Sequence, residues 1–418
     1  MKNLLKTLIS RTTLPSILLY MRILDLKSKI LHLFKINKIY TNTTYNHKKI
    51  ALIALFKNGS LRKDIKNLID RLQKKGYYVI GVNTLKLSKS EIGSFDKLIV
   101  RNNYGRDFGS YKSGFKYLYK HLIKKSKDIE RLIMINDSIF YSLNNDKLDK
   151  FIDDLSDNRY EIIGATENFE VSHHIGSFCM SFSSEILFKK KFMKFWKNYK
   201  LSDIRPTVIK RGELGLSKIA FKCLSGIEKL KVLYSVDTFV DYINSDDYFV
   251  ENFYMLSRKS EIIPWKTPSY KLLHKNIMKD FFAKNDGLVN KGNIKFEAAL
   301  KDIDTDHITN NEQYYDHVKN TNITKDEIKL NIKSMLSRTY VTGSQIHQNY
   351  GYNYLMGCPI LKNDALYRGM LDFEDIIYSK RFLTDEDHEL YIKILLKQPY
   401  GNNVLVGWKK LAFDHGYI

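Results

Sequence analysis

The sequence predicts an α/β protein with a mostly parallel sheet flanked by helices. Two observations support this fold class. Short apolar runs suited to buried strands alternate with segments whose apolar residues recur at helical spacing. Each strand-helix-strand repeat has the length of a βαβ unit, which implies that neighbouring strands run parallel.

The first predicted strand is "KIALIALF" at residues 49–56, followed by the turn "KNGS". A helix with one buried face follows, with Ser60 expected as its N-cap and Gly76 just past its end. The residues that define this face are Leu61, Ile65, Leu68, Ile69 and Leu72. The next strand, "YYVIGV", covers residues 77–82 and completes the first βαβ unit.

The alternation continues to about residue 165. Strands are predicted at 96–100, 131–136 and 160–165, and helices at 111–122 and 148–155. Because ligands of open α/β sheets bind at the carboxyl ends of the strands, the segments that follow the strands at 96–100 and 131–136 are the candidate site.

A chain of 418 residues is long for one core. We predict three parts: a basic amphipathic N-terminal segment at 1–48, an α/β domain that holds the candidate site at 49–250, and a mainly helical C-terminal region at 251–418. The first forty residues hold eight Lys or Arg residues against one acid, which is too many charges for a bilayer span, and no signal-peptide cleavage site follows. Helical spacing of Leu24, Lys27, Ile30, Leu31 and Phe34 favours a helix on an anionic membrane surface; a helix packed on the protein body is the alternative.

The formal net charge of +22 fits nucleic acid, anionic membranes or phosphate-bearing substrates. The chain has no recognition module for DNA or RNA, so nucleic acid is not an expected partner. Part of this excess of positive charge is attributed to a general enrichment of the sequence in Lys. Three distant cysteines, Cys179, Cys223 and Cys358, predict neither a disulfide framework nor a Cys-based zinc site and fit a reducing cytoplasm.

The segment "NNYGRDFGSYKSGF", residues 102–115, leaves a predicted strand and enters a helix. Gly105 and Gly109 allow backbone angles that are closed to other residues, and the helix start favours an anion. Arg106 can fork onto phosphate oxygens, while Asp107 can accept hydrogen bonds from sugar hydroxyls. The alternative is a glycine-rich turn kept for steric reasons alone.

The segment "LIMINDSIF" delivers Asn136, Asp137 and Ser138 to the end of another strand. An exposed Asp with oxygen-bearing neighbours suits Mg²⁺ or Mn²⁺, which would neutralise a departing nucleotide. The alternative is that Asp137 is an N-cap or turn residue.

Three motifs in order, "NNYGRDFGSYKSG", "INDS" and "HHIGSFCMSF", resemble the rhamnan synthesis protein F family of bacterial polysaccharide glycosyltransferases. The resemblance spans roughly residues 50–250. It extends more weakly to the tail segment "SQIHQNYGYNYLMGCPILKNDAL". It implies a GT-A-like, Rossmann-type fold in which residues 49–250 are the nucleotide-sugar-binding catalytic domain. Asn103 and Lys112 would then join the donor-binding turn, and His174 would contact a sugar or phosphate. A structural histidine is the alternative.

In "RGELGLSKIAFKCLSG", Glu213 falls where inverting enzymes of the GT-A type place the catalytic base. The alternative is a first-turn Glu favoured by the helix dipole. The D-x-D of such enzymes is reduced here to Asn136, Asp137 and Ser138, which leaves metal dependence open; Arg106 or Lys112 would supply part of the missing charge. A literal D-x-D at Asp304–Asp306 follows polar residues and is interpreted as a loop.

The resemblance therefore implies a glycosyltransferase. It would move a sugar, with rhamnose as the first candidate, from a nucleotide-diphosphate donor to a lipid-linked glycan acceptor on the inner face of the bacterial cytoplasmic membrane, with inversion. A divalent cation is the expected cofactor if Asp137 binds one. The alternatives are a sugar-phosphate transferase, a nucleotidyltransferase, and a non-catalytic scaffold of the polysaccharide assembly complex.

Overall fold

The computed structural model describes residues 2–34, 37–122, 129–169 and 171–245. Beyond them it describes residues 345–348, 350–363, 383–396, 405–414 and 416–418, with the single positions 333, 337, 340, 341, 377, 379 and 380. The predicted boundary near residue 250 and the segment Asp304–Asp306 lie outside these residues.

A mixed, mostly parallel sheet of eight strands forms the centre of the described fold, as predicted. Its order is β1-β4-β3-β2-β5-β10-β7-β11. β1 and β10 run against the other six strands. The bounds are β1 Lys38–Thr41, β2 Lys49–Leu55, β3 Tyr77–Asn83, β4 Lys97–Val100, β5 Arg131–Asn136, β7 Ile162–Gly164, β10 Cys179–Ser183 and β11 Leu230–Val232.

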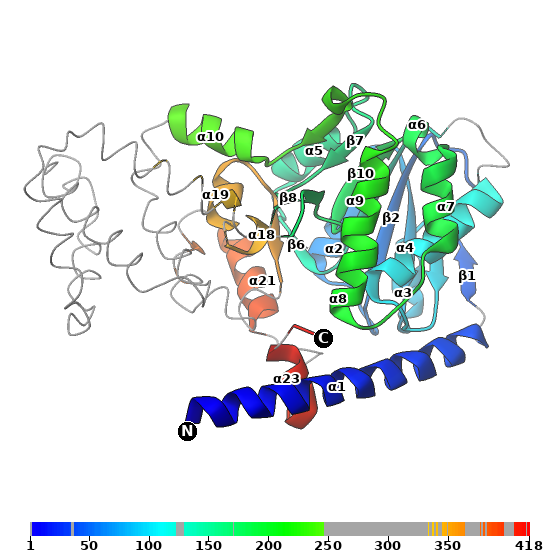
Figure 1. Ribbon diagram of the computed structural model, residues 1–418. Coiled ribbons are helices and arrows are strands. Elements are labelled where there is room, and N and C mark those ends of the chain that lie inside the picture. Colours follow the sequence, from blue (N-terminus) through cyan, green and yellow to red (C-terminus); the bar gives the residue numbers. More distant parts are fainter. Residues whose placement is uncertain are drawn as a thin grey trace, which may run out of the picture.

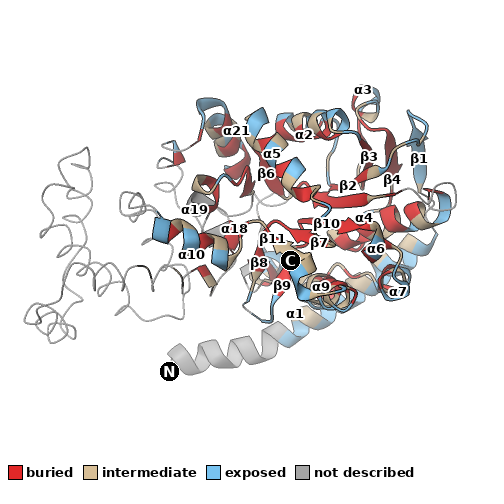
Figure 2. Cartoon of the chain, turned by 90° about the horizontal axis from the view of Figure 1, so that it is seen from above, coloured by how far each residue is buried: buried red, intermediate tan, exposed pale blue. Residues whose placement is uncertain are grey.

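Helices cover both faces of the sheet (Figures 1 and 2). Along β2, Ala51 and Ile53 face one core and Ile50 and Leu52 face the other, as strand alternation requires. The first core contains α2 Lys63–Lys74 and α5 Asn145–Leu155. The second contains α4 Arg106–Tyr117, α6 Ser184–Leu187, α7 Lys190–Asn198 and α9 Leu214–Phe221.

Smaller elements complete the described fold. They are α3 Lys89–Ile92, η1 Leu118–Leu122, β6 Ile139–Tyr141, β8 Glu167–Asn168, β9 His174–Ile175, α8 Arg205–Val208, η2 Ile209–Glu213, η3 Ile227–Lys229, α10 Val236–Ser245, α18 Gln345–Gln348 and α19 Tyr350–Leu355.

The predicted strands at 49–56, 77–82, 96–100 and 131–136 are confirmed, while the strand predicted at 160–165 is shorter. The N-cap prediction was wrong. Helix α2 begins at Lys63, and its N-cap residue is Arg62 rather than Ser60. The arginine side chain turns instead to Asp64 and to two backbone carbonyls. Gly76 follows the helix with φ of 81°, as predicted.

The N-terminal segment forms helix α1, Lys2–Leu33, which runs along one side of the α/β body (Figure 1). Met21 packs in a small cluster with Ile204 and with Ala412 of α23, Gly407–Asp414. Within the described chain, none of the helices combines the length and apolar character needed to cross a membrane.

Part of the C-terminal region packs beside the end of β5, where it forms a separate two-stranded sheet. Strand β12, Ile360–Lys362, pairs antiparallel with β6. Helix α21, Asp385–Leu395, adds Asp387, whose buried carboxylate accepts hydrogen bonds from the Ser142 hydroxyl and from the Leu143 N–H. Residues far apart in the sequence therefore share this edge of the fold.

Candidate active site

The parallel strands β4, β3, β2 and β5 end at the same edge of the sheet, where ligands of α/β proteins bind. Asn83, the last residue of β3, is fully buried. Its amide accepts from the Lys57 N–H at 3.0 Å and donates to the Lys57 carbonyl at 2.8 Å. Lys57, which follows β2, is thus fixed at this edge by its own backbone.

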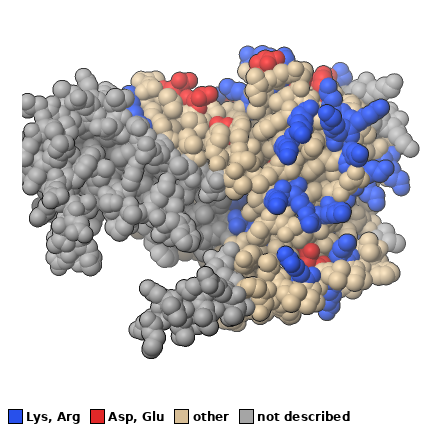
Figure 3. Space-filling model, viewed as in Figure 1, with Lys and Arg blue, Asp and Glu red and all other residues tan. Residues whose placement is uncertain are grey.

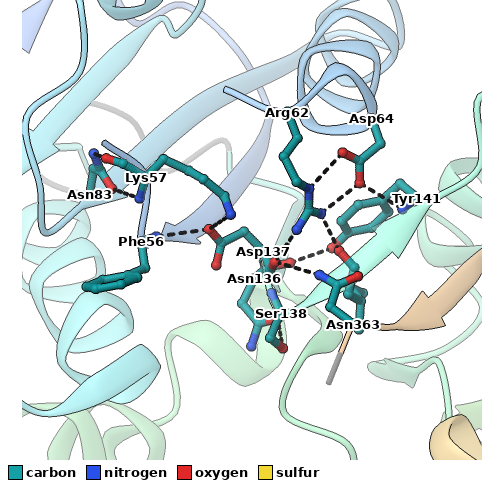
Figure 4. A network of polar contacts seen from close by, with 11 residues as sticks. Phe56, Lys57, Arg62, Asp64, Asn83, Asn136, Asp137, Ser138, Tyr141 and Asn363 are labelled. Atoms are coloured by element: carbon teal, nitrogen blue, oxygen red, sulfur yellow. Dashed lines mark hydrogen bonds and ion pairs between the residues drawn. The ribbon is translucent and has the colours of Figure 1, made fainter. Parts of the chain in front are cut away.

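Asp137 lies at the centre of a polar network at this edge (Figure 4). Its Oδ2 accepts from the Phe56 N–H at 3.0 Å and lies 3.2 Å from the Lys57 ammonium group. Its carbonyl accepts from the Arg62 guanidinium at 2.9 Å, and Arg62 also pairs with the fully buried Asp64. The carboxylate is only 8% exposed, so these contacts hold it in a defined orientation.

Asn136 joins the end of β5 to the start of α4. Its Nδ2 donates to Asp107 Oδ2 at 2.8 Å, and its Oδ1 accepts from the Ser138 hydroxyl at 2.7 Å. Burial and the neighbouring Asp137 carboxylate raise the pKa of Asp107, and Arg106 opposes that rise. The first two predicted motifs are therefore in direct contact.

The turn before α4 has an unusual backbone. Gly105 has φ of 89°, and a Cβ there would lie 2.9 Å from Leu201, so the position requires glycine. Arg106 has φ of 49° and is the one non-glycine residue of the described chain with positive φ. Such conformations cost about 1–3 kcal/mol and cluster at functional sites. The Gly105 N–H is already used, because it donates to Asp203 Oδ1 at 2.7 Å.

Two of the residues predicted to contact the donor have partners within the protein. Gly109 packs against Arg101, which a Cβ at this position would overlap, so its role here is close packing. Lys112 donates from its ammonium group to the Tyr199 carbonyl at 2.5 Å, at the end of α7. Asn103 is exposed in the turn that precedes Gly105.

Glu213 lies beside the buried His174, and α4 reaches the same group of residues. The Ser177 hydroxyl donates to Glu213 Oε1 at 3.1 Å, and His174 Nε2 is 4.0 Å from Glu213 Oε2. Tyr111 of α4 donates to the Ser177 carbonyl at 3.1 Å. His173 turns the other way and contacts Glu167 through Nε2, so one histidine of the pair faces the site, as strand geometry predicts.

The helix that carries Glu213 begins earlier than the sequence indicates. It runs continuously from α8 through the π-helical turn η2 into α9, so Glu213 is not a first-turn residue of a new helix. π-turns are frequent at functional sites. Gly212 allows η2 to approach α4, since a Cβ there would lie 2.7 Å from the Phe108 ring. Glu213 is near enough to contribute to the raised pKa of Asp107.

Sequence reasoning missed three residues of this edge: Lys57, Lys362 and Asn363. Lys362 ends β12 and donates to the Ser138 hydroxyl at 3.0 Å. Asn363 donates from Nδ2 to the Asp137 carbonyl at 3.1 Å. Lys362 and Asn363 lie in the tail segment that resembles the family, so the sequence did mark this segment. Nothing in the sequence indicated that the segment contacts Asp137 and Ser138.

The residues around Asp137 do not form a cation site by themselves. An ammonium group faces the candidate carboxylate, and Asn136 Oδ1 is occupied by Ser138. Across the part of the chain that is described, no three His, Cys, Asp or Glu side chains are grouped closely enough to hold a metal ion. Hard divalent cations prefer several oxygen ligands, so a bound ligand would have to supply most of them.

Comparison with known proteins finds a matching family model and several similar proteins. Residues 81–242 match the model of the family described as rhamnan synthesis protein F. The uncharacterized protein y4gN of Sinorhizobium fredii is 25% identical over 177 residues, covering 40% of this chain and 45% of y4gN. Virulence protein VirA of Vibrio anguillarum is 29% identical over 235 residues, covering 52% of this chain and 70% of VirA.

The chain thus spans less than half the length of y4gN. The family match contains the four side chains that this edge brings together from separate motifs, namely Asp107, Asp137, His174 and Glu213. The resemblance predicted from the motifs is confirmed: over residues 81–242 the chain matches the rhamnan synthesis protein F family, a family of polysaccharide synthesis.

Proposed function

We propose that the protein is a glycosyltransferase that moves a sugar from a nucleotide-diphosphate donor to a growing cell-surface polysaccharide. One observation carries the proposal. Asp107, Asp137 and Glu213 come from three separate motifs, and the other two carboxylates lie near enough to Asp107 to raise its pKa; Asn136, the last residue of β5, donates a hydrogen bond to Asp107. Lys57 and Lys362 lie at the same place. Acids and cations together fit a reaction in which one group takes a proton while another leaves as an anion.

In this proposal the donor diphosphate lies against the start of α4. Arg106, Lys57 and Lys362 offset the charge that develops on the leaving group, which is usually the largest contribution to such a rate. Phe56 follows β2 with 49% of its surface exposed and offers a stacking surface for the nucleobase.

Glu213 is the proposed base. It takes the proton of an acceptor hydroxyl while the acceptor oxygen bonds to the anomeric carbon, and the bond from that carbon to the diphosphate breaks with its electron pair. Attack from the opposite face inverts the configuration. Ser177 orients the Glu213 carboxylate through its hydrogen bond to Oε1, and His174 Nε2 is 4.0 Å from Oε2.

A Mg²⁺ or Mn²⁺ ion on Asp137 is the competing source of positive charge. The contact between Asp137 and Lys57 favours lysine, rather than a bound metal ion, as the source of positive charge. Rhamnose as the sugar and a lipid-linked acceptor rest on the family's description and on the motif resemblance alone.

The test combines thermal-shift screening with product analysis. Nucleoside diphosphates and their sugars are screened with and without Mn²⁺, and we expect one nucleotide to stabilise the protein. Turnover of that donor is then expected to release the nucleoside diphosphate. Release of the nucleoside monophosphate would instead favour a sugar-phosphate transferase, and release of the sugar 1-phosphate would favour a nucleotidyltransferase. If no donor binds or reacts, the scaffold alternative replaces the proposal.

A further inference from the structure

Helix α1 has two different faces. One face is buried or half-buried against the protein and includes Leu18, Met21, Asp25 and His32. The opposite face carries apolar residues at spacings of four and three, which we call the outer stripe. Its members and their exposed fractions are Leu19 60%, Ile23 57%, Leu26 56%, Ile30 48% and Leu33 73%.

The inner face is held by specific contacts, so the outer stripe cannot rotate inward. Asp25 Oδ1 accepts from the Asp203 N–H at 2.6 Å, and Asp25 Oδ2 accepts from the Ser202 hydroxyl at 3.1 Å. Met21 is 6% exposed and packs on Ile204. The single acid of the first forty residues therefore attaches the helix to the body.

Basic residues flank the outer stripe on both sides. At 3.6 residues per turn, Arg22 and Lys29 lie along one side of it and Lys27 along the other; all three are exposed. Positive charge continues on the surface above the helix, where Lys and Arg side chains gather over α7 and α9 (Figure 3). The loop after α7 is the one that Asp25 contacts.

We propose that α1 binds the surface of an anionic lipid bilayer through its outer stripe. The apolar side chains would enter the boundary between headgroups and acyl chains, while Arg22, Lys27 and Lys29 extend to the lipid phosphates. A stripe of large apolar side chains with cations on both flanks complements an anionic interface. It does not complement a neutral apolar partner, which would leave the charges unmatched.

The same contacts connect the lipid-facing helix to the candidate active site. The backbone N–H of Asp203 donates a hydrogen bond to the Asp25 side chain of α1, and the Asp203 carboxylate accepts one from the Gly105 N–H. One residue thus bonds both the helix and the turn that begins α4. The site would therefore lie close to the lipid surface. The membrane proposal itself does not depend on the identity of the donor.

Co-sedimentation of the full chain with vesicles tests the proposal. The vesicles contain phosphatidylcholine alone or phosphatidylcholine with phosphatidylglycerol. We expect binding to the anionic vesicles and release by salt. The variant I23S/L26S/I30S is expected to lose binding. Its matched control is Ile227→Ser, which removes an isoleucine that is 75% exposed elsewhere on the surface.

A second variant, R22Q/K27Q/K29Q, isolates the charges and is expected to weaken partitioning by about a hundredfold. Unchanged melting temperatures of the variants show that the body is intact. Equal vesicle binding by I23S/L26S/I30S and the wild type would overturn the proposal. The proposal would also be overturned if the wild type bound neutral and anionic vesicles equally. A third contrary result would be a wild-type dimer that dissociates in I23S/L26S/I30S while vesicle binding persists.

Discussion

The ammonium group of Lys362 lies 3.0 Å from the hydroxyl oxygen of Ser138, although 224 positions separate them in the chain. The pairing of β12 with β6 produces this contact, because it places the end of β12 beside the end of β5. A cation from the C-terminal region therefore joins residues of the family-matched segment.

Lys362→Ala is expected to weaken donor binding because it removes one of the cations facing the diphosphate. A hydrogen bond to a charged group contributes about 1.5–3 kcal/mol, so the donor KM should rise by about ten- to a hundredfold. Steady-state kinetics and donor titration measure this change. Lys393→Ala, at an exposed lysine of α21, is the control. An unchanged KM in Lys362→Ala would remove Lys362 from the proposed site.

Glu213→Gln should preserve the fold and donor binding but abolish most of the transfer. The amide keeps the hydrogen bond from Ser177 but cannot take the acceptor proton, so kcat should fall about 10²–10⁴-fold. Single-turnover assays with saturating donor measure this step. Glu228→Gln, at an exposed glutamate of η3, is the control. Near-normal kcat in Glu213→Gln would identify another base.

Gly212→Ala should separate η2 from α4, because its Cβ would lie 2.7 Å from the Phe108 ring. We expect a loss of about 1–3 kcal/mol in the free energy of unfolding, with a decrease in kcat as Glu213 moves. Gly215→Ala is a matched control, since its Cβ would meet Phe195 at an ordinary 3.5 Å. Urea unfolding and kcat measure both effects, and equal behaviour of the two variants would contradict this account.

Asp107 predicts a pH-dependent stability. Burial and Asp137 raise the pKa of Asp107 in the folded protein above its usual value. Between the two values the unfolded chain loses this proton while the folded protein keeps it, so folding stability falls as pH rises through that window. Asp107→Asn removes the effect. The free energy of unfolding of Asp107→Asn, relative to that of the wild type, should therefore increase from about pH 4 towards neutrality.

Urea unfolding at several pH values measures that difference. Asp241→Asn, at an exposed position of α10, controls for the loss of a carboxylate. A constant difference between Asp107→Asn and the wild type across the pH range would contradict the prediction.

Arg62→Ala should destabilise the protein strongly. It leaves the fully buried Asp64 carboxylate without its partner and removes the donor to the Asp137 carbonyl. Losing one member of a buried pair costs about 3–5 kcal/mol. Arg71→Ala breaks the more exposed pair with Asp149 and should have a smaller effect. Denaturant midpoints compare the two variants, and equal losses would show that burial of the Arg62–Asp64 pair does not set its contribution.

The sequence predicted the parallel half of the sheet because its strands are local patterns. After Lys49, "KIALIALF" is apolar throughout, as is typical of a strand covered on both faces. The antiparallel insertion of β10 between β5 and β7 was not predicted, since strand order depends on tertiary pairing. Leu24 of α1 was expected on the lipid-facing side, but it is half-buried because Asp25 fixes the rotation of the helix.

Part of the candidate site was predictable, where a motif marks the residues that the structure groups together. Asp107, Asp137, His174 and Glu213 follow recognisable strand ends or family motifs. No motif marks Lys57 or Lys362. Lys57 is held at the site by its backbone hydrogen bond to Asn83, and Lys362 is brought there by the pairing of β12 with β6. Gly109 packs on Arg101, which is a steric reason for glycine that the sequence does not distinguish from a functional one.

The pairing of β12 with β6 also constrains the order in which the protein is assembled. A ribosome releases every strand of the main sheet long before it reaches Ile360. A nascent or prematurely terminated chain can therefore complete its sheet while Ser138 still lacks its cationic neighbour. The electrostatic balance at this edge of the sheet is consequently settled late in synthesis, and fragments that end before Ile360 should bind anions with a different affinity from the full chain.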